Sequence, residues 1–263
     1  MSTGATVGIV GGSGMLGHAI ATGWLSSGAV SPDRLWISNR SGSRAGFEDW
    51  PDVTVTADSQ ALADACDVIL LSVPPALAGG IGISAPDRLV ASVMAGVTLD
   101  RIAALTGTTR VVRAMSSPAA ALRLAYSPFA ASGATEDDRT MIRHLLSAIG
   151  TTDEVPDEAQ IDLFTAMTGP VPGFVAFFAA CMQGYATDRG VAPEVAERAV
   201  RQLFLSAGQM MADGPAPDTH VRQMIDYAGT TAAGLLAMQE TDIAEAIAKG
   251  LDAAVARTRG IAG

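Results

Sequence analysis

The chain has 263 residues, of which 49% are hydrophobic and 17% charged, a composition that predicts a globular protein with one or two well-buried domains. Its formal net charge of −10 disfavours nucleic acids and anionic membranes as partners, although a local basic pocket could still bind one phosphorylated ligand. The sequence shows no signal peptide and no bilayer-length apolar run, so we expect a cytoplasmic protein. Cys66 and Cys181 lack the paired spacing of a metal site and are interpreted as buried free thiols.

The first half of the chain alternates short apolar segments with helical ones. Strands are predicted at residues 5–10, 34–38, 52–56, 67–73, 88–94 and 110–114. Helices are predicted at residues 18–27, 59–65 and 99–105, with Gly28 as a stop signal and Ser59 as a cap. Near-continuous apolar strands in this order indicate a parallel sheet covered by helices on both faces, so residues 1–153 are predicted to form an α/β domain.

After residue 153 the strand signal disappears, and residues 154–263 are predicted to form an all-α domain. The helices are expected at residues 157–167, at 173–186, from Pro193 to just before Gly214, and at 241–257. Pro170 and Pro172 separate the first two of them. Several of these helices carry apolar faces that a small bundle alone would not cover, which indicates contacts between subunits.

A glycine-rich turn follows the first predicted strand and opens the first helix. Its residues are Gly12, Ser13, Gly14, Met15, Leu16 and Gly17. In this pattern one glycine permits the tight turn, one lets backbone N–H groups approach a pyrophosphate, and one lets the helix pack on the sheet. The helix N-terminus adds partial positive charge for the phosphates. The turn therefore predicts a dinucleotide site of the Rossmann type.

The end of the second predicted strand distinguishes NADP from NAD. An NAD site usually has Asp or Glu there to bind the ribose 2′-hydroxyl, whereas this chain has Asn39, Arg40 and Ser41. Arg40 can pair with a 2′-phosphate, Asn39 and Ser41 can donate hydrogen bonds to it, and Arg44 can add to the charge. An ordinary solvated arginine is the alternative. The pattern favours NADP(H) as the cofactor.

Six segments along the chain match the motifs of one known family: residues 12–17, 39–40, 93–97, 110–115, 165–170 and 229–232. On these segments the chain resembles the pyrroline-5-carboxylate reductase family. The resemblance implies an N-terminal Rossmann domain and an all-α helical dimerisation domain like the C-terminal domain of 6-phosphogluconate dehydrogenase. It further implies a homodimer or higher homo-oligomer, with the active site between the nicotinamide and the helical domain of a neighbouring subunit.

The resemblance also implies hydride delivery from NADPH to the carbon of a small-molecule cyclic imine. It places Val73, Pro74, Ala95 and Gly96 at the cofactor. A cyclic imine arrives largely protonated, so the protein mainly orients the reactants and excludes water. This fits a chain whose three histidines, His18, His144 and His220, are interpreted as structural or surface residues.

Three segments depart from the family pattern. The family's Met-Pro-Asn-Thr-Pro is replaced at residues 115–119, and its Val-Lys-Pro is replaced at residues 73–75. Its Ser-Pro-Gly-Gly loop, which in the family helps to hold the substrate carboxylate, is replaced at residues 226–229. Asp226 in that loop would repel a carboxylate.

Two interpretations of the loop follow. In one, Asp226 caps a helix or is solvated, points away, and the substrate is pyrroline-5-carboxylate. In the other, which we favour, Asp226 and Tyr227 face the site and the carboxylate pairs with the iminium of an imine that lacks this carboxylate or carries it elsewhere. Thr231 matches the family threonine near the substrate nitrogen or N-caps a helix, and Thr168 lines the site or only accompanies a kink.

Two other functions stay open. One is a hydroxy-acid dehydrogenase of the same two-domain architecture, disfavoured because the chain's single lysine, Lys249, lies near the C-terminus and no histidine is placed as a base. The other is a non-catalytic regulatory protein that binds NADP.

Overall fold

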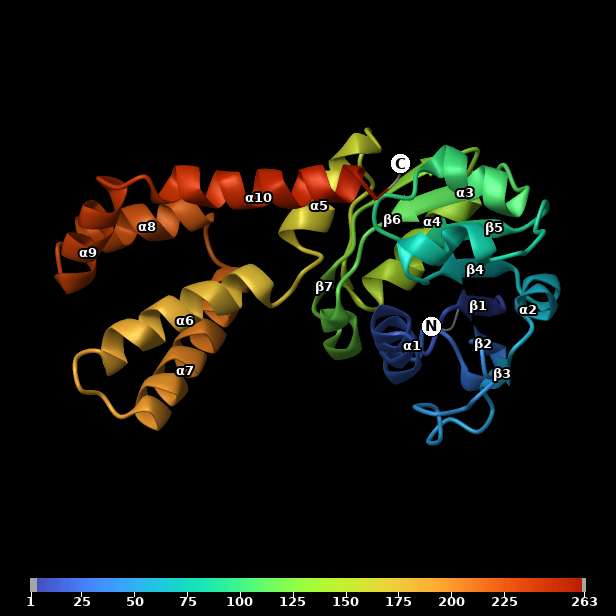
Figure 1. The fold of residues 1–263 in the computed structure, drawn as a ribbon, viewed down its shortest axis with the longest axis horizontal. Helices are drawn as coiled ribbons and strands as arrows, with labels where there is room; N and C mark the ends of the chain where they lie inside the picture. The colour runs from blue at the N-terminus through green and yellow to red at the C-terminus, as the bar shows by residue number, and fades with distance from the viewer. Residues whose placement is uncertain (1–3, 262–263) are drawn as a thin grey trace. The chain divides into compact units, whose positions relative to one another are not determined.

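The computed structural model describes residues 4–261 and consists of two compact units (Figure 1). The first unit comprises the chain up to Val171 together with the residues from Leu251 onward, and the second unit is Pro172–Gly250. Helix α5 (Ala159–Met167) belongs to the first unit because its Ile161 packs into the core there. The domain boundary at residues 153 and 154 lies before this helix and stays a prediction.

The first unit is built on a seven-stranded sheet with the strand order β3-β2-β1-β4-β5-β6-β8. Neighbouring strands are parallel except β6 and β8, which are antiparallel. The strands are β1 (Val7–Val10), β2 (Leu35–Ser38), β3 (Thr54–Thr56), β4 (Val68–Leu71), β5 (Leu89–Ser92), β6 (Val111–Ala114) and β8 (Phe129–Ser132). A separate pair joins β7 (Ala125–Tyr126) to β9 (Gly150–Thr151). The parallel strands lie within the ranges predicted from the sequence, whereas β7, β8 and β9 were not predicted.

Side chains along the central strands alternate between two hydrophobic cores, as expected when both faces of a sheet are covered. In β4, Val68 and Leu70 join one core, and Ile69 and Leu71 join the other. The helices that complete these cores are α1 (Met15–Ser27) and α4 (Glu136–Ser147) on the first face, and α2 (Ser59–Ala65) and α3 (Leu99–Thr106) on the second. This arrangement confirms the predicted α/β class.

Capping explains where the helices of this unit begin and end. Gly28 ends α1 in the left-handed conformation, as predicted. The predicted cap of α2 is wrong by one residue: the Asp58 carboxylate accepts the N–H groups of Gln60 and Ala61 at 2.9 and 3.1 Å, whereas Ser59 is the first helical residue. The sequence analysis did not predict α4, which Thr135 opens with a capping box.

Short 3₁₀ segments connect the elements of the first unit. They are η1 (Pro32–Arg34), η2 (Pro75–Gly80) and η3 (Pro118–Leu122). The second unit is helical and contains α6 (Gly173–Thr187), α7 (Pro193–Ala212), α8 (Pro217–Asp226) and α9 (Thr230–Gln239), and α10 (Ile243–Arg259) begins in it. α6 packs beside α7, and α8 beside α9. Helices α8 and α9 were not predicted from the sequence.

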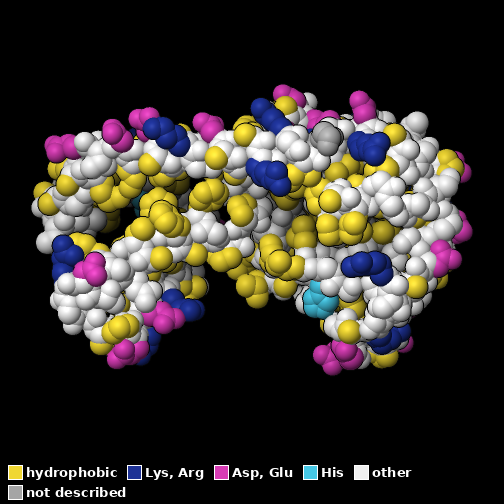
Figure 2. Space-filling view, in the orientation of Figure 1, with side chains coloured by type: hydrophobic (Ala, Val, Ile, Leu, Met, Phe, Trp, Pro, Cys, Tyr) yellow, Lys and Arg dark blue, Asp and Glu magenta, His cyan; other side chains and the backbone are white. Residues whose placement is uncertain are grey.

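The helices of the second unit leave much of their apolar surface uncovered. Phe177 on α6 is 69% exposed and Met210 on α7 is 71% exposed, and hydrophobic side chains are visible over these helices in Figure 2. Cys181 on α6 is also exposed, which corrects the expectation of a buried thiol, whereas Cys66 is buried. Of the helices in the part of the chain that the structure describes, none combines the length and apolarity that a membrane-spanning helix needs.

An ion pair between half-buried Arg110 and buried Asp138 ties the start of α4 to the residue before β6. Arg110 donates from Nε to Asp138 Oδ2 over 2.9 Å and from Nη2 to Oδ1, and the Thr135 N–H donates to Oδ2 over 2.9 Å. The hydrogen bonds from Arg110, helped by those from Thr135, lower the pKa of Asp138 from its usual 3.8 to about 2. Because the folded pKa is depressed, the stabilisation is present above pH 3.8 and is lost as pH falls toward 2.

We expect the change Asp138→Asn to lower the free energy of unfolding at neutral pH by about 2 kcal/mol, since one pKa unit corresponds to about 1.4 kcal/mol. The difference from the wild type should shrink as pH falls from 3.8 to about 2. Chemical denaturation across this pH range measures both. Asp137→Asn, an exposed change in the same helical turn, is the control and should have little effect. A loss from Asp138→Asn that stays constant down to the lowest pH would contradict the account.

Candidate functional site

The turn after β1 is closed by glycines that leave no room for a side chain. Gly11 has a φ of +85°, and a Cβ there would lie 2.5 Å from the carbonyl oxygen of Ser72. A Cβ on Gly12 would lie 2.8 Å from the Ile37 side chain, and one on Gly17 would lie 2.6 Å from the Gly11 carbonyl oxygen. The turn therefore packs directly against the ends of β2 and β4 and sets α1 close to the sheet.

Helix α1 begins at the same turn with a free N-terminus. Gly14 is its N-cap, in an extended conformation and with no side-chain capping bond. The helix begins at Met15, three residues before the predicted start at His18. The first N–H groups of a helix have no partner within the helix, and the helix dipole makes this end partially positive. An anion such as a pyrophosphate is the ligand that this arrangement favours.

A groove of about 1230 Å³ runs past the turn, at the carboxyl ends of β1, β2 and β4. It contains six of the predicted cofactor residues: Ser13, Gly14, Asn39, Arg40, Val73 and Pro74. Other predicted residues are not among its lining: Gly12, Met15, Leu16, Gly17, Ser41, Ala95 and Gly96. Gly12 and Gly17 are buried and shape the turn from behind.

Two walls of the groove were not predicted from the sequence. One is the N-terminal end of α2 at residues 58–60, and the other is the glycine-rich stretch at residues 79–82, which spans the end of η2. The run Ala78-Gly-Gly-Ile-Gly82, which starts five residues after the strand predicted at residues 67–73, was the available signal. Both walls lie at the groove because βα connections of a parallel sheet meet at the carboxyl edge of its strands.

Arg40 is the free cation of the groove. It is exposed and, within residues 4–261, its guanidinium has no hydrogen-bond or ion-pair partner. Asn39 is engaged in its own loop, because its Oδ1 accepts the N–H groups of Ser41 and Ser43 and its Nδ2 donates to the Ser43 carbonyl over 2.8 Å. The Ser41 hydroxyl also donates to Asn39, and Arg44 donates to the Trp50 carbonyl. Of the predicted anion-binding side chains, Arg40 is thus the one left without a partner.

The groove fits a dinucleotide that carries an extra phosphate. Gly11 and Gly14 line the groove without side chains of their own, and the residue that follows β2 by two positions is a cation where an NAD site usually has an acid. Asp58 also lines the groove, but its carboxylate is occupied in capping α2. The described residues include no cluster of three or more His, Cys, Asp or Glu that could hold a metal ion.

The loop between α8 and α9 carries the candidate substrate residues of the second unit. Asp226 ends α8, is exposed, and has no side-chain partner among the described residues. Tyr227 beside it is 83% exposed. Gly229 is the N-cap of α9, so Thr231 is the second helical residue. The alternative in which Thr231 is a helix N-cap is therefore wrong, because extended Gly229 takes that position. Asp226 is the last residue of α8, and Tyr227 is the C-cap, so of the two alternatives for an Asp226 that points away, the solvated residue fits the structure.

Thr168 lies in the first unit, at the C-terminal end of α5. Its hydroxyl donates to the Phe164 carbonyl over 3.0 Å, which leaves the oxygen as an acceptor. The segment from Thr168 to Pro172 separates α5 from α6 as a break between two helices. The three histidines lie outside the lining of the groove, and His18 bonds to the Gly46 carbonyl over 2.9 Å.

Comparison with known proteins covers both units. A family described as pyrroline-5-carboxylate reductase dimerisation matches residues 158–261, and one described as NADP oxidoreductase, coenzyme F420-dependent, matches residues 6–96. Pyrroline-5-carboxylate reductase 2 of Bacillus subtilis (strain 168) is 31% identical over 245 residues, which cover 90% of this chain and 88% of that relative.

Solved structures agree with the fold. The pyrroline-5-carboxylate reductase of Coxiella burnetii superposes with a TM-score of 0.87 at 25% identity and covers 98% of this chain and 99% of that one. The pyrroline carboxylate reductase of Plasmodium falciparum, solved with NADP bound, superposes over 100% of both chains with a TM-score of 0.84 at 18% identity. The sequence motifs and these matches agree, and the chain belongs to the pyrroline-5-carboxylate reductase family.

Proposed function

We propose that this protein is an NADPH-dependent oxidoreductase that reduces the C=N bond of a cyclic imine. The observation that carries the proposal is the groove over the glycine turn, with unpartnered Arg40 where an acid would select NAD. Membership of the reductase family supports the reaction class. The Plasmodium falciparum relative, solved with NADP bound, supports the cofactor.

The residues of the groove bind and orient the cofactor. Arg40 pairs with the 2′-phosphate, and the N-terminus of α1 at Ser13 and Gly14 holds the pyrophosphate. Val73 and Pro74 continue the groove, and we place Ala95 and Gly96 at the nicotinamide end. NADPH supplies a hydride when bound. A protonated C=N group accepts that hydride at carbon and becomes a neutral amine, so the chain need not supply a proton in this step.

The substrate is proposed to meet Asp226, Tyr227, Thr231 and Thr168. Asp226 is an unpaired carboxylate at the C-terminal end of α8, where the helix dipole adds further negative charge. A positively charged iminium is favoured there, and a substrate carboxylate is repelled. We therefore propose an imine that lacks a carboxylate at this position. Thr231 is proposed as a hydrogen-bonding partner of the imine or amine nitrogen, and Thr168 is proposed as a residue that lines a substrate site.

The second unit is proposed to complete its core in a homo-oligomer. Its described helices bury few residues, while Phe177, Tyr185 and Met210 are each more than half exposed. Exposed apolar patches of this kind are typical of subunit interfaces. The family match to a dimerisation domain over residues 158–261 supports a second copy of the chain as the partner.

The alternative hydroxy-acid dehydrogenase finds no support in the groove, since its lining residues within the described chain include neither Lys nor His. A non-catalytic NADP-binding protein would bind NADPH without turnover on cyclic imines. A cytoplasmic location stays a prediction.

Replacing Arg40 with Gln should lower kcat/KM for NADPH by about 10- to 100-fold, because a hydrogen bond to a charged group contributes about 1.5–3 kcal/mol. The value for NADH should change little, since NADH lacks the 2′-phosphate. Steady-state kinetics with both cofactors measures this. Arg44→Gln is the control, because Arg44 is engaged with the Trp50 carbonyl. Equal losses with NADPH and NADH would refute the role of Arg40.

The change Asp226→Asn should lower kcat/KM on an uncarboxylated cyclic imine about tenfold, since a charge-assisted contact to the iminium is lost. Activity on pyrroline-5-carboxylate should rise or stay constant, because the repulsion is removed. Asp213→Asn is a matched control, since Asp213 is the exposed C-cap of α7 as Asp226 ends α8. Unchanged kinetics on both substrates would show that Asp226 is only a solvated residue.

Introducing a charge with Phe177→Asp should weaken self-association at least tenfold, because burying an unpaired carboxylate in an apolar interface is costly. Sedimentation over a range of protein concentrations measures the oligomer dissociation constant, and circular dichroism verifies the fold. Leu122→Asp, at a side chain that is 73% exposed on the first unit, is the control. An oligomer unaffected by the Phe177 change would place the interface elsewhere.

A further inference from the structure

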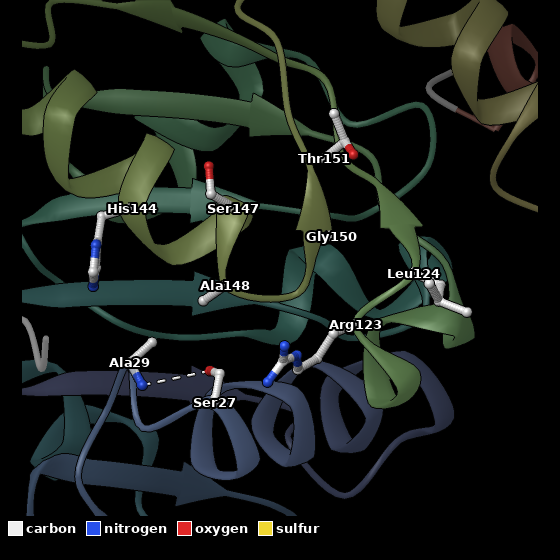
Figure 3. Close-up of a pocket in the computed structure, with 9 residues that line it drawn as sticks. All are labelled: Ser27, Ala29, Arg123, Leu124, His144, Ser147, Ala148, Gly150 and Thr151. Carbon is white, nitrogen blue, oxygen red and sulfur yellow. Dashed lines mark hydrogen bonds between the residues drawn. The ribbon is translucent and has the colours of Figure 1, made fainter. Parts of the chain in front are cut away.

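A second hollow of about 620 Å³ lies in the first unit, and none of its lining residues lines the cofactor groove (Figure 3). It is formed where α1 and α4 end, beside β9 and the residue that follows η3. We propose that this hollow is a binding site for a small anion, a carboxylate or a phosphate, with Arg123 as its principal ligand. The proposal is independent of the function assigned to the groove.

Arg123 reaches across this hollow. Figure 3 shows its guanidinium extending from the end of η3 toward Ser27. The guanidinium has no hydrogen-bond or ion-pair partner anywhere in residues 4–261. A cation with five N–H donors is therefore free at the edge of a hollow large enough for a small molecule.

The backbone fixes Arg123 in this position. Its φ is +60°, and only Ala228 shares a positive φ among the described residues other than glycine. Its N–H donates to the Ala120 carbonyl over 3.0 Å, and η3 packs so closely on α1 that a Cβ on Gly23 would lie 2.4 Å from that carbonyl oxygen. Glycine is the residue that suits this backbone conformation. An arginine held there against the conformational preference is typical of a functional position.

Further polar side chains line the hollow. The hydroxyls of Ser147 and Thr151 line the hollow, and neither has a side-chain partner within the described part of the chain. His144 also lines it, and its Nε2 is buried without a hydrogen-bond partner. None of the nine described lining residues carries a carboxylate. The side chains around the hollow thus favour an anion, in a protein whose net charge of −10 otherwise disfavours one.

Two helix C-termini end at the hollow, and their carbonyl groups would oppose an anion if they were free. Some of these carbonyl groups accept hydrogen bonds from the chain itself. The Trp24 carbonyl accepts the Ala29 N–H over 3.1 Å, and the His144 carbonyl accepts the Ala148 N–H over 3.2 Å. The Ala29 N–H also lies 3.4 Å from the Ser27 hydroxyl oxygen (Figure 3). The Trp24 and His144 carbonyl groups are thus less available to oppose an anion.

The test compares Arg123→Gly with the wild type. Binding of inorganic phosphate is followed by phosphorus NMR and binding of carbon-13-labelled acetate by carbon NMR, with NADP⁺ present to occupy the groove. We expect the variant to bind each anion that the wild type binds at least tenfold more weakly than the wild type does. Because glycine suits the left-handed backbone, the melting temperature of the variant should stay constant or rise. The loss of binding then cannot be attributed to unfolding.

Arg34→Gln provides the matched control, since Arg34 is another exposed arginine of the first unit without a side-chain partner among the described residues. It should leave anion binding unchanged. Arg123→Lys should retain part of the affinity, because it keeps the charge and loses the planar fork. Two results would overturn the proposal: no binding of either anion to the wild type, or equal binding by the wild type and Arg123→Gly. Self-association that is lost in Arg123→Gly without an effect on anion binding would instead assign the hollow to a subunit contact.

Discussion

The close approach of the glycine turn to the sheet is the contact on which the rest of the groove depends. Gly11 lies against the Ser72 carbonyl, where a Cβ would be only 2.5 Å away, and this brings the end of β4 next to the start of α1. The free helix N-terminus, the Arg40 loop and the segment after β4 then face one space. A methyl group at Gly11 would separate these walls as well as strain the backbone.

The charged side chains divide into two groups with different roles. Arg110 and Arg113 are paired with acids, and the Arg113 guanidinium reaches Asp162 and Glu158 on and beside α5. These pairs hold helices to the sheet. Arg40, Arg123 and Asp226 are exposed and lack side-chain partners within residues 4–261. An exposed charge alone says little, but each of these three lies at a groove, a hollow or a family-specific loop. At these three places ligands of opposite charge are expected.

Local rules predicted most of the fold because the elements carry strong signals of their own. The apolar strands β1 to β6 and Gly28 at the end of α1 were correctly located for this reason. Helix α4 was missed although Thr135 and Asp138 form a capping box before an apolar stripe. Strand β8 was not predicted because its four residues form a strand through pairing with β6, and the sequence of one segment does not show with which strand it pairs.

The candidate site could be predicted where a glycine indicates a backbone constraint or where the charge of a side chain indicates the ligand. Gly12, Gly14 and Arg40 fall into this class. The sequence did not show that Asn39 is engaged within its own loop, because that depends on three-dimensional contacts with Ser41 and Ser43. It also gave no sign of the hollow at Arg123, whose residues come together only through the packing of η3 on α1.

The central claim is that the groove is built for a dinucleotide with a 2′-phosphate. Isothermal titration of the wild-type protein with NADP⁺ and with NAD⁺ tests it most directly, because it measures binding without any assumption about the substrate. The account predicts that NADP⁺ binds at least tenfold more tightly than NAD⁺, with the difference decreasing at high salt as the Arg40–phosphate attraction is screened. Equal affinities for the two dinucleotides, or tighter binding of NAD⁺, would contradict it.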